Sequence, residues 1–195
     1  AALAQCTART CAARARSTTG GRGAQRPELL RAARRLGVPV VATEHCAEKI
    51  GATDRRLLPL VDTVLHKQHF DATREADTVP RLPRGRHNVL VLGTEAHVCV
   101  LQTALGLAGS GLHPWLVADC IGSRSESDRA VALQRWLQSG CNIVSSEMAM
   151  FEWLGSAAHP AFRDVIALVK ARPETLLAEA ETSVSDVNQA SVSES

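Results

Sequence analysis

The stretch VLVLGTEAHVCVLQTAL, residues 89–105, begins with four aliphatic residues in a row. Such a run is typical of a strand that is buried on both faces, as strands are in a parallel sheet. After a turn at Gly93 and Thr94, apolar residues return at helical spacing and continue to about Gly109. The stretch therefore predicts a strand, a turn and a helix, which together make one repeating unit of an α/β fold.

Cys99 falls in the first turn of this predicted helix. Ligands of open α/β sheets bind beyond the carboxyl ends of the strands, and a helix N-terminus favours the negative charge of a thiolate. Both arguments indicate a cysteine nucleophile with a lowered pKa. The alternative is a core cysteine, because free cysteine is among the most frequently buried residue types. The residues by themselves leave these two interpretations open.

The rest of the chain repeats the strand–helix alternation. A helix that opens at Pro27 and ends before Gly37 is followed by a buried strand at 38–42. Alternating strands and helices predict parallel βαβ units with right-handed crossovers. Further strands are expected at 61–66, 113–118 and 142–145, and further helices from Ser125 or Ser127 to Gly140, at 147–154 and at 160–171.

The composition of the chain argues against several classes of partner. The net charge of +2 is small and no basic stripe with aromatic residues follows the first residues, so no nucleic-acid partner is expected. No apolar run approaches the roughly 20 residues of a membrane span, so no membrane partner is expected. The six cysteines lack metal-binding or CxxC spacing, which predicts reduced thiols, a reducing compartment and no metal.

The two ends of the chain differ from its centre. Residues 1–26 hold five arginines and no acidic residue, and they show neither strand alternation nor a buried-strand run. They are interpreted as a targeting peptide, a disordered basic tail or an out-of-frame start, and the last is preferred. A cytoplasmic location is expected, or a mitochondrial one if 1–26 is a targeting segment. Residues 27–172 form the predicted domain, and 173–195 a polar, disordered tail.

Residues 93–104 resemble the nucleophile segment of the isochorismatase-like cysteine hydrolases, closest to the isochorismatase domain-containing proteins of unassigned substrate. The resemblance implies a doubly wound, Rossmann-like three-layer αβα fold. Its mostly parallel sheet of six strands has the order 3-2-1-4-5-6. The family uses an Asp, a Lys and a Cys, and the Asp lies on the first strand. The similarity runs from about Leu29 to Arg172 and includes VATEH at 41–45, HKQHF at 66–70, VADC at 117–120, SRS at 123–125 and SSE at 145–147.

The resemblance also implies roles for particular residues. Cys99 is the nucleophile, and Lys67 holds the charge of the thiolate and of the intermediate. The backbone amides of Glu95 and Cys99 form the oxyanion hole, with a cis peptide between Thr94 and Glu95. Substrate-lining candidates are His97, His45 and Phe70. His97 is not expected to be the base of Cys99, because helix residues two apart do not face each other.

Metal-dependent relatives carry Asp-x-His where this chain has Thr43-Glu44-His45, so no metal and no other cofactor is expected. The aspartate of the first strand has no counterpart, since the first acidic residue is Glu28. The first strand is therefore expected to be atypical or missing, which would leave the central position of the sheet vacant and the chain poorly folded.

Two functions remain open. One is a cysteine hydrolase that acts on a small amide, ester or vinyl-ether substrate. The other is a catalytically inactive member of the family that serves as a scaffold for a ligand or a partner. A homo-oligomer is also expected, because aromatic residues gather in the C-terminal third at Trp136, Phe151 and Trp153.

Overall fold

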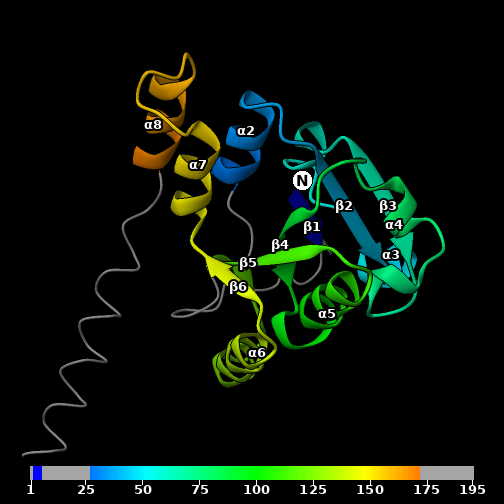
Figure 1. Ribbon diagram of the computed structural model, residues 1–195. Helices are drawn as coiled ribbons and strands as arrows, with labels where there is room; N and C mark the ends of the chain where they lie inside the picture. The colour runs from blue at the N-terminus through cyan, green and yellow to red at the C-terminus, as the bar shows by residue number, and fades with distance from the viewer. Residues whose placement is uncertain (1, 6–26, 172–195) are drawn as a thin grey trace, which may run out of the picture.

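The computed structural model describes residues 2–5 and 27–171 and has the three layers of an α/β fold (Figure 1). All the strand pairs are parallel, and the strands form one sheet in the order β3-β2-β1-β4-β5-β6. An α/β fold with a parallel sheet is thus confirmed. The strands are β1 (Ala2–Gln5), β2 (Val40–His45), β3 (Thr63–Lys67), β4 (Asn88–Thr94), β5 (His113–Gly122) and β6 (Asn142–Val144).

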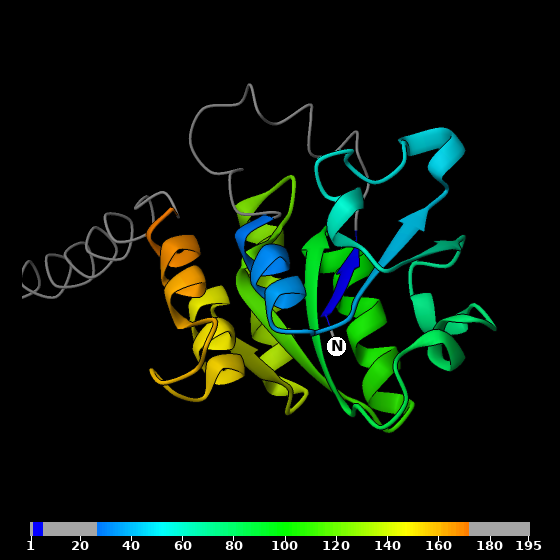
Figure 2. The ribbon, with the colours of Figure 1, turned by 90° about the horizontal axis from the view of Figure 1, so that it is seen from above.

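Helices cover both faces of the sheet. On one face α2 (Pro27–Arg35), α7 (Ser146–Leu154) and α8 (Phe162–Lys170) lie side by side, as Figures 1 and 2 both show. On the other face lie α5 (Leu101–Gly109) and α6 (Glu126–Gln138). The loops hold the short elements α3 (Ala47–Ile50), η1 (Leu58–Leu60), η2 (Ala72–Arg74) and α4 (Thr78–Arg81).

The aliphatic run of β4 divides its side chains between two cores. Val89 and Val91 pack in the core beneath α5 and α6, whereas Leu90 and Leu92 pack in the core beneath α2, α7 and α8. Successive strand side chains point to opposite faces, so a sheet covered on both sides needs an unbroken apolar run. The strand expected at 89–92 is confirmed, and its side chains contribute to both cores.

The expectation of a missing first strand is wrong. Residues Ala2–Gln5 form β1, which occupies the central position and pairs in parallel with β2 and with β4. The register places Gln5 opposite Thr43 on one side and Gly93 on the other. The arginines that made residues 1–26 unsuitable for a strand begin at position 9, outside these four residues. A ladder is made by backbone groups, so a short run of small and apolar residues is enough to form it.

Several sequence expectations differ from the structure in detail. The strand expected at 113–118 runs to Gly122, with an irregular register opposite Val91 and Gly93 of β4. Ser125 rather than Ser127 caps α6, because its side chain accepts a hydrogen bond from the Asp128 N–H. The interpretations of residues 6–26 and the predicted disorder of 173–195 lie outside the described residues. Among the helices that the structure describes, none is both long and apolar enough to cross a membrane.

Candidate active site

Cys99 lies at the carboxyl edge of the sheet, on the segment that joins β4 to α5. This segment is a π-helical turn, η3 (Ala96–Val100), where the sequence had predicted the start of an ordinary helix. The Glu95 carbonyl accepts hydrogen bonds from the N–H groups of Val98 and Val100. The peptide bond between Thr94 and Glu95 is cis. Single π turns are frequent at functional sites, so the local geometry marks this edge as a candidate active site.

Lys67 is the last residue of β3 and is buried, with 3% of its surface exposed. Its Nζ donates to the carbonyl oxygens of His69 at 3.0 Å and Phe70 at 2.9 Å. The charge of this ammonium also acts on the Cys99 thiol and favours its thiolate form. The structure thus brings together Cys99 and Lys67, the two side chains to which the resemblance gave catalytic roles.

The charge state of this pair is set by opposing effects. Burial raises the pKa of the Cys99 thiol, and the Lys67 ammonium opposes this rise by favouring the thiolate. Burial likewise lowers the pKa of Lys67, and its contact with Cys99 opposes that fall. The sequence had predicted a lowered pKa for Cys99. In the structure the pKa of Cys99 is raised instead, because burial of the thiol outweighs the effect of the neighbouring cation.

The loop that follows β3 is held by Glu75. One carboxylate oxygen of Glu75 accepts the N–H of Gln68 at 2.7 Å, the N–H of His69 at 3.0 Å and His69 Nδ1 at 2.8 Å. Hydrogen bonds from the His69 and Gln68 N–H groups lower the pKa of Glu75 to about 2. The carboxylate therefore stays charged at neutral pH and fixes the turn whose carbonyl groups receive Lys67.

Two of the substrate-lining candidates form one wall beside Lys67. The rings of His45 and Phe70 lie with their centroids 5.2 Å apart, and Phe70 is 55% exposed. Burial, and then the charge of Lys67, lower the pKa of His45, so this imidazole is neutral at pH 7. His45 Nδ1 is buried and has no hydrogen-bond partner among the described residues. The wall thus combines the exposed ring of Phe70 with the neutral, polar ring of His45.

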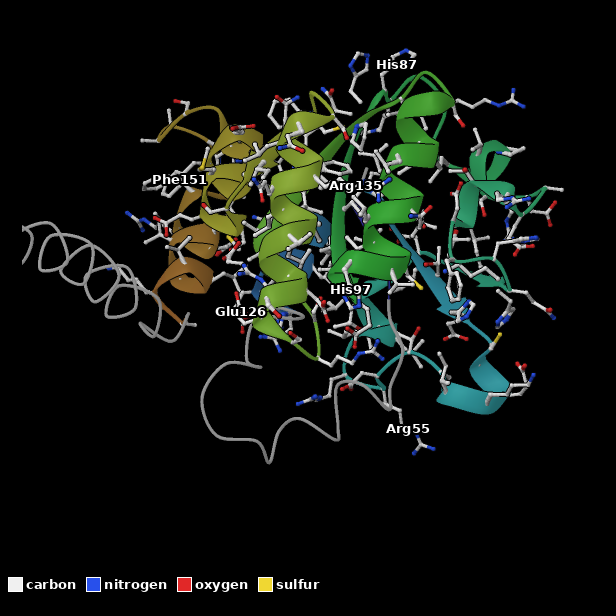
Figure 3. All side chains as sticks on the ribbon, turned by 90° about the horizontal axis from the view of Figure 1, so that it is seen from below. Arg55, His87, His97, Glu126, Arg135 and Phe151 are labelled. Carbon is white, nitrogen blue, oxygen red and sulfur yellow. The ribbon has the colours of Figure 1, made fainter. Side chains whose placement is uncertain are left out.

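His97 belongs to a separate polar group at the same edge. Its Nδ1 lies 3.0 Å from Ser123 Oγ and 3.7 Å from Glu95 Oε2, and its Nε2 lies 3.7 Å from Asp128 Oδ2. Ser123 Oγ also accepts the N–H of Ala96 at 3.1 Å. Figure 3 shows His97 near the end of α6 that carries Glu126. His97 therefore contacts Ser123, whose hydroxyl also holds the N–H of Ala96, and its role in lining the substrate site stays a prediction.

The structure also identifies residues that the sequence analysis missed. Glu75, Ser123 and Thr103 hold the backbone of the two segments that carry Lys67 and Cys99. Ser123 and Thr103 bond to residues distant in the chain, whereas Glu75 bonds within its own loop. The usable signal in the sequence was the spacing of Thr103, four residues after Cys99 on a predicted helix. In the described part of the chain, no three His, Cys, Asp or Glu side chains are placed to hold a metal ion.

Comparison with known proteins defines the class to which this fold and this cysteine site belong. The family model described as Isochorismatase domain matches residues 22–148. The chain belongs to the isochorismatase family.

Its relatives include other proteins described by the same domain. Isochorismatase domain-containing protein 2 of Bos taurus is 38% identical over 146 residues, which cover 73% of this chain and 70% of that protein. Isochorismatase domain-containing protein 1 of Danio rerio is 34% identical over 148 residues, which cover 73% of this chain and 51% of that protein. This chain therefore matches only about half the length of the second relative.

The fold of this chain also resembles that of proteins with solved structures. A protein described as MAR1 ribonuclease of Caenorhabditis elegans superposes with a TM-score of 0.73 and 29% identity, over 90% of this chain and 93% of that one. The YcaC gene product of Escherichia coli, described as an octameric hydrolase of unknown specificity, gives a TM-score of 0.66 at 18% identity. That match covers 87% of this chain and 93% of the other, and it supports the fold alone.

Proposed function

We propose that this protein is a cysteine hydrolase that acts on a small amide, ester or vinyl-ether substrate. The observation that carries the proposal is the buried Lys67 ammonium, whose charge acts on the Cys99 thiol at the carboxyl edge of the sheet. A buried cation is costly unless it is paired, and here two carbonyl groups and a thiol surround it. Such an arrangement is expected where a negative charge develops on sulfur or on a neighbouring oxygen.

The chemistry for an amide or ester follows from this placement. The Cys99 sulfur attacks the carbonyl carbon, and the carbonyl oxygen becomes an oxyanion that accepts hydrogen bonds from the backbone amides of Glu95 and Cys99 in the proposed hole. Collapse of this intermediate expels the amine or alcohol, which must take up a proton. Water then hydrolyses the thioester and regenerates the thiol. Lys67 lowers the energy of the thiolate at the start and at the end of this cycle.

Proton transfer is the incomplete part of the site. Residues 1–26 contain no acidic residue, and among the described residues Glu95 is the carboxylate whose charge acts on Cys99. Glu95 Oε2 also accepts the N–H of Arg124 at 2.9 Å. The absence of the first-strand aspartate also supports a second candidate, an inactive family member that binds a ligand or a partner at the same edge.

Acylation by p-nitrophenyl acetate separates these candidates. A hydrolase is expected to release p-nitrophenol and to gain one acetyl group on Cys99, seen by intact mass and peptide mapping, while Cys99→Ser does neither. Cys141→Ser is the matched control, because Cys141 is also half-buried but lies at the other end of α6. Acetylation that does not depend on Cys99 would contradict the proposal. Turnover of a panel of amides then defines the substrate. Cleavage of an RNA oligonucleotide, with no turnover of the amides, would contradict the proposal that the substrate is a small molecule.

We also propose that the protein forms a homo-oligomer, although not through all the aromatic residues expected. Of the three aromatic residues, Trp136 is fully buried in one core, Trp153 is partly buried against the other, and Phe151 is exposed. Val131 and Leu137 on α6, and Met148 and Phe151 on α7, are exposed. Sedimentation velocity at micromolar concentration is expected to show a dimer or larger species, and Leu137→Lys is expected to weaken it. A monomer at every concentration would contradict this proposal.

A further inference from the structure

Thr103 links the helix that follows the nucleophile to the loop that holds the lysine. It lies on α5, four residues after Cys99, and its side chain is fully buried. Thr103 Oγ1 donates to the Phe70 carbonyl oxygen at 3.2 Å and accepts the N–H of Ala72 at 2.9 Å. The hydroxyl therefore both donates a hydrogen bond to this loop and accepts one from it. Among the described hydrogen bonds, no other side chain of α5 bonds to the loop.

The Phe70 carbonyl is the point at which this contact meets the active site. The same oxygen accepts Lys67 Nζ at 2.9 Å. A carbonyl oxygen has two acceptor sites, so Thr103 and Lys67 together fill them. The position of this oxygen decides where the ammonium lies relative to the Cys99 sulfur. Displacement of the Phe70 carbonyl would therefore move the cation away from the thiol, although Thr103 touches neither of them directly.

The packing around Thr103 makes this arrangement rigid. A Cβ atom added at Gly106, on the same helix, would collide with the side-chain oxygens of Asp71 and Thr73. Helix α5 and the loop thus lie so close together that position 106 has room only for glycine. The Asp71 carboxylate is itself occupied by the N–H of Thr73 at 2.8 Å and the hydroxyl of Thr73 at 2.7 Å. The loop has little freedom to adjust if Thr103 stops holding it.

We infer that Thr103 is a positioning residue of the active site, which sets the reactivity of Cys99 by holding the Phe70 carbonyl that orients Lys67. This inference rests on the proposed function, in which Lys67 stabilises the Cys99 thiolate. Thr103 acts through the lysine and has no contact with the reacting atoms.

The readout is the pH dependence of Cys99 alkylation by iodoacetamide, followed by peptide mapping. The charged and titratable groups that act on the pair are Asp71 and Glu75 around Lys67, and Glu95 and Cys46 around Cys99, with His45 beside them. None of these groups is changed by a substitution at Thr103. Thr103→Val keeps the shape of the side chain and removes the hydroxyl, so alkylation near neutral pH is expected to slow by about 2- to 10-fold. Thr103→Ser, which keeps the hydroxyl, is expected to restore the rate.

The decisive comparison is a double-mutant cycle with Lys67→Met. If Thr103 acts through the lysine, Thr103→Val has no further effect when Lys67 is already Met, whereas a general loosening of the fold would slow or speed alkylation equally in both backgrounds. Equal effects in both backgrounds, or a wild-type profile for Thr103→Val, would overturn the inference. A Lys67→Met profile identical to wild type would instead refute the proposed function. If Thr103→Val does not fold, Thr103→Ala is measured in the cold under the same criteria.

Discussion

Lys67→Met is expected to slow alkylation of Cys99 near neutral pH by about 10- to 1,000-fold, since an opposite charge in contact shifts a pKa by about 1–3 units. The sign follows from the charge. The ammonium favours the thiolate, so its removal adds to the effect of burial and raises the pKa of Cys99 further. The thiolate fraction at any pH below that pKa falls, and the alkylation rate falls with it.

The pH profile distinguishes this effect from simple loss of access to the thiol. The variant is expected to reach the same maximal rate as the wild type, but at higher pH, because only the thiolate fraction has changed. Lys170→Met is the matched control, since Lys170 is exposed on α8. Cys120 should label slowest in every variant, because it is fully buried. A profile lowered at all pH values would indicate a distorted site instead, and an unchanged profile would contradict the role of Lys67.

Lys67→Met also removes the donor that the His69 and Phe70 carbonyl groups share. The Phe70 carbonyl keeps the hydroxyl of Thr103, whereas the His69 carbonyl loses the donor given for it. A lost hydrogen bond costs about 0.5–1.5 kcal/mol, so a slightly lower melting temperature is expected as well. The two measurements answer different questions. Stability reports the lost hydrogen bonds of the loop, whereas the alkylation profile reports the charge felt by the sulfur.

The elements of the fold could be predicted where periodicity and burial agree. The run from Val89 to Leu92 is apolar at every position, which is typical of a strand covered on both faces, and the structure divides these residues between two cores. The first strand could not be predicted in this way. Four residues are too few to show a period, and the arginines that follow them dominate the composition of the segment.

The site was predictable to a similar degree. Cys99 follows from the strand–turn–helix pattern, but Lys67 was supported by resemblance, since a single lysine at a strand end is usually a surface residue. The raised pKa of Cys99 could not be foreseen, because the extent of burial depends on tertiary packing. The roles of Glu75 and Thr103 rest on hydrogen bonds to backbone groups, and no residue pattern encodes which carbonyl or N–H group a side chain will meet.

The presence of β1 changes what the missing aspartate means. A vacant central position would have left the sheet poorly folded, but the structure fills that position, so what is missing is the aspartate side chain and not the strand. In the family the aspartate lies on the first strand, and β1 ends at Gln5, opposite Thr43 and Gly93 in the ladder. Thr43 is two residues before His45, and Gly93 lies directly before the Thr94–Glu95 peptide. Position 5 is therefore at the carboxyl edge of the sheet, on the strand between those that carry these two segments.

Gln5→Asp is accordingly expected to raise turnover of p-nitrophenyl acetate by about 100- to 10,000-fold, the range that a positioned acid–base group contributes. The turnover profile should also gain an acidic limb, because the new carboxylate works as a base only when it is ionised. Gln5→Asn is the matched control, since it has the shape of aspartate without the charge, and it is expected to leave turnover unchanged. An equal gain in both variants would show that the side chain acts by its size. No gain in either, with Cys99 still alkylated at the wild-type rate, would show that a missing base is not what limits this protein, and would favour the scaffold over the hydrolase.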